Sequence, residues 1–305
     1  MAHFRDNKRT IHQLLKIIDF DHITFTGGEP FCADGLGELI LDCRLKGKSV
    51  NVISNGTKGS VEEYATLKKL GVGLLEFPLH SEHASLHETM TAVPGSFEKV
   101  VESIRYCIRS GIEVCTVVVL TKVNIDHLEA TLAFAQSLGV KHMMLARFNV
   151  GGRGIANVNH LMPSKEQLKS AFTVAHEYLK KSSLHISANV CLPECIIRPE
   201  DYPAMYISRC SSDVNRRPIT VNSFGDIRMC NHSPVTVGSI WDSSIDSIIN
   251  SKYIEQWHQR ADHCSNCVRW DTCGGGCRAA SEQLGYSLWQ VDPIVTAMNT
   301  VLENG

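Results

Sequence analysis

The sequence predicts an α/β fold: a parallel sheet or barrel over residues 1–185, followed by a small cysteine-rich α+β domain over residues 186–305. Strand-like and helix-like segments alternate through the first part, and the elements shorten in the second. Eight of the twelve cysteines lie in that second part. A chain of 305 residues can bury a large core, and one large domain with a small one is the natural division.

Short apolar segments supply the predicted strands of the first part, at residues 23–25, 50–53, 74–79, 114–120 and 143–148. Segment 114–120 is almost entirely apolar, as expected for a parallel strand that is covered on both faces. Repeated strand–helix units of this kind indicate a parallel sheet or a barrel.

Apolar residues at helical spacing predict the intervening helices. One helix is expected near residues 8–18, and a later one is expected to be capped by Ser96 and ended by Gly111. Ser164 and Gln167 have the spacing of a capping box, which predicts a further helix start.

A cysteine block in the second part is the most informative motif. Its four thiols are separated by two, five and three residues, and they are Cys264, Cys267, Cys273 and Cys277. This spacing, in a glycine-rich loop, lets several sulfurs point into one small volume, as a soft metal centre requires. A structural four-cysteine zinc site is one alternative for the same residues.

A glycine loop follows the first predicted strand, with the sequence Thr-Gly-Gly-Glu-Pro at residues 26–30. Two glycines let a ligand approach the backbone and leave amides free to donate hydrogen bonds. The carboxylate of Glu29 suits a cationic amine, and the carboxyl end of a parallel strand is where barrel enzymes place their sites. A plain β–α turn is the alternative interpretation.

Charge and composition exclude several classes of function. The net charge is −2 with no basic face, which argues against a nucleic-acid partner. No apolar run approaches membrane-spanning length, and the first residues lack the apolar core of a signal peptide. Twelve cysteines without a secretion signal therefore predict a cytoplasmic protein.

Together, the two motifs resemble the radical SAM superfamily and its C-terminal SPASM domain. The glycine loop resembles the family's SAM-binding signature, and Cys210, Gly225 and Cys230 precede the cysteine block as they do in SPASM domains. Residues 77–97 also resemble the family's fourth-strand segment. The resemblance covers almost the whole chain and implies a partial TIM-type (β/α) barrel followed by a SPASM domain.

The resemblance also implies where S-adenosylmethionine (SAM) binds. The residues expected along this rim are Gly27, Gly28, Glu29, Pro30 and Asn55. Arg147, which ends the fifth predicted strand, is a candidate for binding the SAM carboxylate.

The resemblance further implies one or two auxiliary 4Fe-4S clusters. The first would take Cys210, Cys230, Cys277 and one upstream cysteine, for which Cys195 is preferred over Cys191. The second would take Cys264, Cys267 and Cys273. No cysteine follows the block, so Asp292 is a candidate oxygen ligand, or the second cluster is open, incomplete or absent.

The chain departs from the family at its SAM-cleaving motif, because no cysteine triplet spaced three and two occurs in the sequence. We therefore expect an N-terminally shortened chain that lacks the first barrel strand, with the SAM-cleaving cluster present only in a longer form. That form would cleave SAM reductively to a 5′-deoxyadenosyl radical and modify a peptide or protein, with flavodoxin or ferredoxin as reductant. The alternatives are a non-catalytic iron–sulfur relative for electron transfer or peptide binding, and a zinc-stabilised interaction module.

Other candidate ligands are interpreted as structural. His80, His83 and His87 are expected to be solvated, with metal binding the less favoured alternative. The remaining cysteines, Cys32, Cys43, Cys107 and Cys115, are expected to pack in the core.

Overall fold

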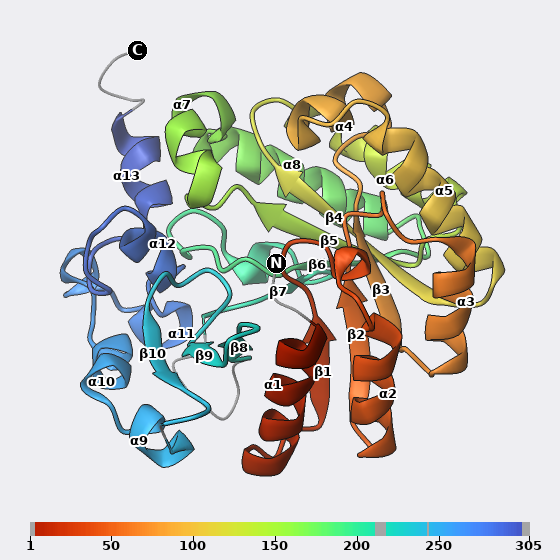
Figure 1. Cartoon of the computed structure of the whole chain (residues 1–305). Coiled ribbons are helices and arrows are strands. Elements are labelled where there is room, and N and C mark those ends of the chain that lie inside the picture. Colours follow the sequence, from red (N-terminus) through yellow and green to blue (C-terminus); the bar gives the residue numbers. More distant parts are fainter. Residues whose placement is uncertain (1–3, 211–217, 243, 301–305) are drawn as a thin grey trace.

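A computed structural model describes residues 4–210, 218–242 and 244–300, excluding the side chains of 297–300. Seven parallel strands form one sheet in chain order, from β1 to β7, and a three-stranded antiparallel sheet follows (Figure 1). The strands of the large sheet are β1 His22–Phe25, β2 Ser49–Ile53, β3 Leu74–Pro78, β4 Glu113–Leu120, β5 His142–Arg147, β6 His185–Ala188 and β7 Tyr206–Ile207. The predicted strands and the partial barrel are confirmed.

The large sheet continues beyond the predicted domain boundary at residue 185. That boundary falls inside β6, and β7 pairs with β6 in parallel through Ser187 and Tyr206. The segment between these two strands carries Cys191 and Cys195, so the first two cysteines of the second part lie within the barrel connection. The division at residue 185 itself stays a prediction.

Helices follow most of the strands and cover the outer face of the sheet (Figure 1). They are α1 Phe4–Ile17, α2 Leu36–Leu45, α3 Val61–Lys69, α4 Ala84–Thr91, α5 Ser96–Arg109, α6 Leu128–Ser137, α7 Val158–Leu161 and α8 Lys165–Leu179. The predicted capping box of α8 is present, since Ser164 and Gln167 bond reciprocally. The prediction for α5 is wrong by one residue. Gly95 takes the cap position at φ 73°, and Ser96 is already helical.

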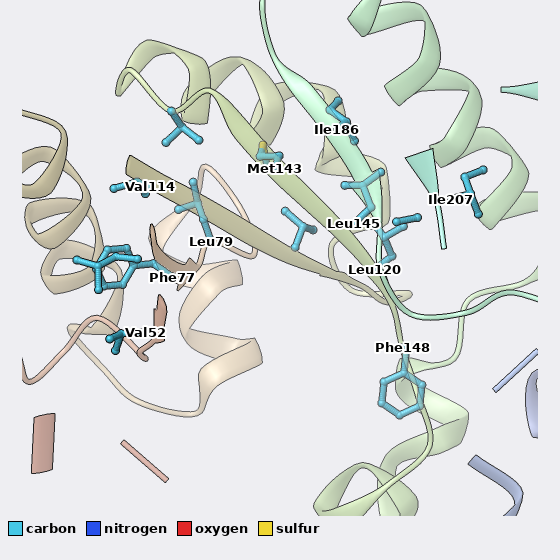
Figure 2. Packing of buried hydrophobic residues seen from close by; sticks show 14 of the residues in the cluster. Val52, Phe77, Leu79, Val114, Leu120, Met143, Leu145, Phe148, Ile186 and Ile207 are labelled. Atoms are coloured by element: carbon cyan, nitrogen blue, oxygen red, sulfur yellow. The ribbon is translucent and has the colours of Figure 1, made fainter. Parts of the chain in front are cut away.

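Alternation along the strands separates the two faces of the sheet. Phe77, Leu120 and Leu145 are fully buried on the helix-covered face (Figure 2). The parallel register places Ile53, Glu76 and Cys115 next to one another on the opposite, inner face. Burial raises the pKa of Glu76 to about 7. A carboxylic acid thus lies within the barrel without a cationic partner among the described residues.

The second part is built from short elements. They are β8 Thr220–Val221, β9 Asp226–Arg228, β10 Thr236–Ser239, α9 Ile245–Ile249, α10 Lys252–His258, α11 Trp270–Cys273, α12 Arg278–Gln283 and α13 Pro293–Thr300. Strands β8 and β9 pair antiparallel as a short hairpin. None of the helices in the described residues is both long enough and apolar enough to span a bilayer.

Helix α1 connects the start of the barrel to the second part. Thr10 Oγ1 donates a hydrogen bond to the Ser223 carbonyl at 2.9 Å, and the Arg9 guanidinium lies 4.3 Å from the centre of the Trp241 ring. A buried ion pair makes a further connection at the end of β5. Arg147 Nη2 lies 2.6 Å from Asp292 Oδ2, and both side chains are fully buried.

We predict that Glu76→Gln stabilises the protein at alkaline pH. The raised pKa of Glu76 means that the folded state holds a proton which the unfolded state releases, so stability is lost as pH rises from about 4.5 to about 7. The gain should reach about 2–3 kcal/mol at pH 8 and vanish at pH 4. Urea unfolding of the variant and the parent at pH 8 and at pH 4 measures this gain in the free energy of unfolding. Glu113→Gln, at an exposed position on β4, is the control and should change neither value.

We predict that Arg147→Met lowers the free energy of unfolding by about 3–5 kcal/mol, because it leaves the Asp292 carboxylate buried without its cation. The double variant Arg147→Met/Asp292→Leu should recover part of this loss. Denaturant unfolding of the two variants and the parent gives the comparison. A loss under about 1 kcal/mol in the single variant would show that the pair is not buried as described.

Candidate functional site

The glycine loop lies at the carboxyl end of β1. Gly27 and Gly28 are exposed, and a Cβ placed on either residue would meet no heavy atom within 4 Å. Gly27 has φ 125°, a conformation that favours glycine. The backbone here is open, so a ligand can approach it closely, and the residues present fit the amino-acid end of SAM.

Glu29 is held in place by the ends of two neighbouring strands. Its Oε1 accepts hydrogen bonds from the Phe31 amide at 3.2 Å and from Ser54 Oγ at 2.8 Å. Its Oε2 accepts one from the Asn55 amide at 2.7 Å. Pro30 begins the short helix η1 (Pro30–Cys32) directly after it. The structure therefore brings the five predicted rim residues together at one edge of the sheet.

Arg147 has a different environment from the one expected. Its Nε donates to the Cys191 carbonyl at 2.9 Å and its Nη2 to Asp292 Oδ2, while Nη1 is buried without a partner among the described residues. The guanidinium thus lies against the cysteine-rich part. Binding of the SAM carboxylate by Arg147 stays a prediction, and two of its three guanidinium nitrogens already have partners.

A first group of cysteines forms at this position. A hydrogen bond with the Cys210 thiol, burial and the neighbouring Cys277 together raise the pKa of Cys191. Burial also raises the pKa of Cys277 to about 12, opposed by the nearby Arg147. The upstream cysteine beside Cys210 and Cys277 is therefore Cys191, whereas the sequence favoured Cys195.

A second group surrounds Cys195. Burial and the thiols of Cys273 and Cys267 raise the pKa of Cys195. Burial and the thiols of Cys267, Cys273 and Cys195 likewise raise the pKa of Cys264. Cys264, Cys267 and Cys273 therefore lie near Cys195. The interpretation from the resemblance had placed Cys195 in the first cluster instead.

Asp292 is not placed to be a ligand of this second group. Its Oδ2 accepts hydrogen bonds from Arg147 and from the Cys277 amide at 2.7 Å, and its Oδ1 accepts one from the Ile294 amide at 3.1 Å. The carboxylate instead fixes the last cysteine of the block to the end of β5.

Amide groups donate to several of the sulfurs. Cys230 Sγ accepts from the Ser233 amide at 3.2 Å, Cys273 Sγ from the Glu194 amide at 3.3 Å, and Cys277 Sγ from Asn149 Nδ2 at 3.3 Å. Hydrogen bonds of this type tune the potential of iron–sulfur ligands. The membership of Cys230 in the first group rests on the family resemblance.

Glycine makes the tight end of the cysteine block possible. Gly276 has φ 82°, and a Cβ there would lie 2.5 Å from Asp292 Oδ2 and 2.6 Å from Pro193 Cγ. Only a residue without a side chain lets the backbone turn from Cys273 to Cys277 against these neighbours. Gly276 therefore lets the last cysteine of the block lie close to Asp292 and Pro193.

The separation of the sulfurs distinguishes between metal centres. A tetrahedral zinc ion with Zn–S bonds of about 2.3 Å holds its sulfurs about 3.8 Å apart. Among the described residues, no three cysteine sulfurs lie within 4.8 Å of one another. An iron–sulfur cluster contains several metal ions and sulfides, so it needs a wider set of thiolates. The donor set fits clusters better than it fits a zinc knuckle.

A buried cation lies near both groups. Arg278 is 3% exposed, and its Nε and Nη1 have no hydrogen-bond partner among the described residues. The thiols of Cys210 and Cys264 raise its pKa, although burial lowers the pKa more. Unsatisfied guanidinium nitrogens beside thiols suit an anionic group that would occupy the space between them. No local sequence pattern singles out Arg278, which directly follows Cys277.

Some predictions for the other residues are wrong. His87 is fully buried, and burial lowers the pKa of His80 to about 3, so neither imidazole is solvated. Cys32 is exposed, although the other three cysteines of the barrel are buried as predicted.

Comparisons with known proteins agree with this architecture. Residues 4–135 match the model of the Radical SAM superfamily. The AdoMet-dependent heme synthase of Oleidesulfovibrio alaskensis is 22% identical over 292 residues, which are 90% of this chain and 74% of the relative. The PqqA peptide cyclase of Granulibacter bethesdensis is 24% identical over 277 residues, with corresponding shares of 88% and 72%.

Solved structures share the fold over most of the chain. Streptococcus suis SuiB bound to S-adenosylmethionine superposes with a TM-score of 0.73 at 14% identity, covering 95% of this chain and 69% of SuiB. The enzyme anSMEcpe with bound AdoMet and Cp18Cys peptide gives 0.71 at 14% identity, with coverage of 99% and 92%. Residues 4–135 of this protein therefore resemble the Radical SAM superfamily, and SPASM-type relatives and solved structures are similar to it along most of its length.

Proposed function

We propose that this chain is the SAM-binding barrel and auxiliary-cluster region of a radical SAM/SPASM enzyme that modifies a peptide or protein. The observation that carries the proposal is the gathering of the cysteines into two groups beside the barrel, with sulfurs too far apart for a single zinc ion. When bound next to a reduced cluster, SAM supplies a 5′-deoxyadenosyl radical that abstracts hydrogen from the substrate.

In this proposal the chain's own residues orient SAM. Gly27 and Gly28 leave the backbone open to its amino-acid end, and the Glu29 carboxylate accepts its ammonium group. The hydrogen bonds from Ser54 and Asn55 fix that carboxylate before SAM arrives, so little ordering is needed on binding.

We assign the auxiliary clusters from the two groups of thiols. The first cluster would take Cys191, Cys210, Cys230 and Cys277, and the second would take Cys195, Cys264, Cys267 and Cys273. In the first group Arg147 provides positive charge, and Arg278 provides it near Cys210 and Cys264. This assignment completes the second cluster with a cysteine, so an oxygen ligand from Asp292 is not needed.

A peptide or protein is the proposed substrate class. Among the relatives, one group is named PqqA peptide cyclase, and SuiB has been solved with its precursor peptide SuiA. A one-electron reductant such as flavodoxin or ferredoxin and a cytoplasmic location fit oxygen-sensitive clusters. The SAM-cleaving cluster would belong to a longer form, because the 305 residues contain no matching cysteine triplet.

A non-catalytic iron–sulfur relative is the second candidate, favoured by the same missing triplet. Such a protein would use the auxiliary clusters for electron transfer or for binding a peptide. A form extended with a cysteine triplet separates the two candidates, because only the enzyme would then produce 5′-deoxyadenosine.

We predict that the 305-residue chain, reconstituted with iron and sulfide and supplied with SAM and dithionite, yields no 5′-deoxyadenosine. The extended form should yield it, and Glu29→Gln in that form should lower the yield at least about tenfold by weakening the hold on the SAM ammonium group. Chromatography of the quenched reaction measures the product. Product from the 305-residue chain would contradict the need for the cysteine triplet, and no product from the extended form would contradict the enzymatic proposal.

We predict that anaerobic reconstitution gives about eight irons per chain, as two four-iron clusters require. Cys195→Ser should lose the second cluster and Cys191→Ser the first, each seen as a loss of about half the iron and of one electron paramagnetic resonance signal. Cys32→Ser, an exposed cysteine outside both groups, is the matched control. Full iron in Cys195→Ser, or stoichiometric zinc in place of iron, would refute the assignment.

A further inference from the structure

One carboxylate and two imidazoles, side chains of the kind that can bind a metal ion, lie close together at the carboxyl end of the large sheet, outside the cysteine groups. Glu82 and His83 lie between β3 and α4, and His127 ends the short helix η2 (Ile125–His127) after β4. Glu82 Oε1 lies 3.3 Å from His83 Nε2 and 3.0 Å from His127 Nδ1. Among the described residues, this is the one set of three such side chains whose ligand atoms all lie within 4.8 Å of one another.

These separations match the edges of a metal coordination shell. An ion bound to nitrogen and oxygen at about 2.0–2.1 Å in tetrahedral geometry holds neighbouring ligand atoms about 3.3 Å apart. Two of the three edges are already near this length. The third joins His83 and His127, and the His83 side chain is 61% exposed, so its imidazole has room to adjust.

Glu82 is oriented as metal-binding carboxylates are. Its Oε2 accepts hydrogen bonds from Ser81 Oγ and Thr131 Oγ1, both at 3.0 Å, which leaves Oε1 facing the two imidazoles. Burial acts to raise the pKa of Glu82, but the hydrogen bonds from His127, the backbone, Thr131 and Ser81 hold it below its ordinary value. A charged carboxylate with a fixed outer oxygen is a second-shell arrangement that strengthens metal sites.

The two loops that carry these residues are joined rigidly. Asn124 Nδ2 donates to the carbonyls of His80 at 2.8 Å and Val119 at 2.9 Å, and its Oδ1 accepts from the Thr121 amide at 2.9 Å. The position of His127 relative to Glu82 is therefore set by the fold rather than by chance contact of exposed side chains.

We infer that Glu82, His83 and His127 bind one divalent transition-metal ion, separate from the iron–sulfur clusters. Two imidazoles and one carboxylate favour zinc or a similar borderline ion over calcium or magnesium. The exposed side of His83 leaves the remaining coordination positions open to water or to a substrate group at this end of the barrel.

Zinc binding to the anaerobically reconstituted protein tests the inference, because the cysteines are then occupied by iron. Equilibrium dialysis with zinc alone should show one equivalent in the parent protein. We expect Glu82→Gln and His127→Gln to lose this equivalent or bind it at least about tenfold more weakly. His12→Gln is the matched control, since His12 Nε2 lies 2.9 Å from Asp42 Oδ2 in a pair with a single imidazole. Equal zinc binding by the parent and all three variants would overturn the inference.

The location of the ion gives a second, independent readout. Anomalous diffraction at the zinc edge should place the ion between Glu82 and His127, and the iron content of His127→Gln should equal that of the parent. An anomalous peak at the cysteines alone, or no zinc equivalent in the parent, would show that the trio is only a hydrogen-bonded cluster. If the cysteines do not bind iron–sulfur clusters as assigned, the iron content of the reconstituted protein and its cysteine variants will show it. The zinc measurement at Glu82 and His127 is separate from that result.

Discussion

The buried pair of Arg147 and Asp292 is the contact on which the arrangement of the cysteines depends. Asp292 Oδ2 accepts from both Arg147 and the Cys277 amide, and Arg147 also donates to the Cys191 carbonyl. One ion pair therefore fixes the end of β5, the segment after β6 and the end of the cysteine block. Burial removes the competition from water that weakens such pairs at the surface.

The electrostatics of the two cysteine groups follow from that arrangement. Thiols gathered in a buried space have raised pKa values, because each thiolate would be poorly solvated and would repel its neighbours. A polycationic iron centre reverses this balance, since its ligands must be deprotonated to bind. In the proposed assignment, the unpartnered nitrogens of Arg147 and Arg278 would compensate the net negative charge of a thiolate-bound cluster.

The other two candidate sites, at Glu29 and at Glu82, lie at the carboxyl edge of the sheet. Glu29 is fixed by donors from the end of β2, and Glu82 by donors from its own loop and from α6. Glu29 accepts hydrogen bonds on both carboxylate oxygens, whereas Glu82 accepts hydroxyl donors on Oε2 and lies close to two imidazoles through Oε1. The parallel topology gathers these loops because every strand ends at the same edge.

Much of this protein followed from local sequence alone. The strands ending at Phe25 and Arg147, the capping box at Ser164 and the glycine loop at Gly27 are short-range patterns, which the backbone satisfies wherever the segment lies. The cysteine block was equally visible, because its spacing is contained in fourteen residues.

Only the tertiary structure decided which distant residues meet. Cys191 and Cys195 are four positions apart, and nothing local assigns one to Cys210 and the other to Cys264. His127 reaches Glu82 because β3 and β4 are neighbours, and Asp292 turned out to hold an arginine instead of a metal. Such pairings depend on how strands and loops pack across the whole chain, so the spacing of residues along the sequence does not predict them.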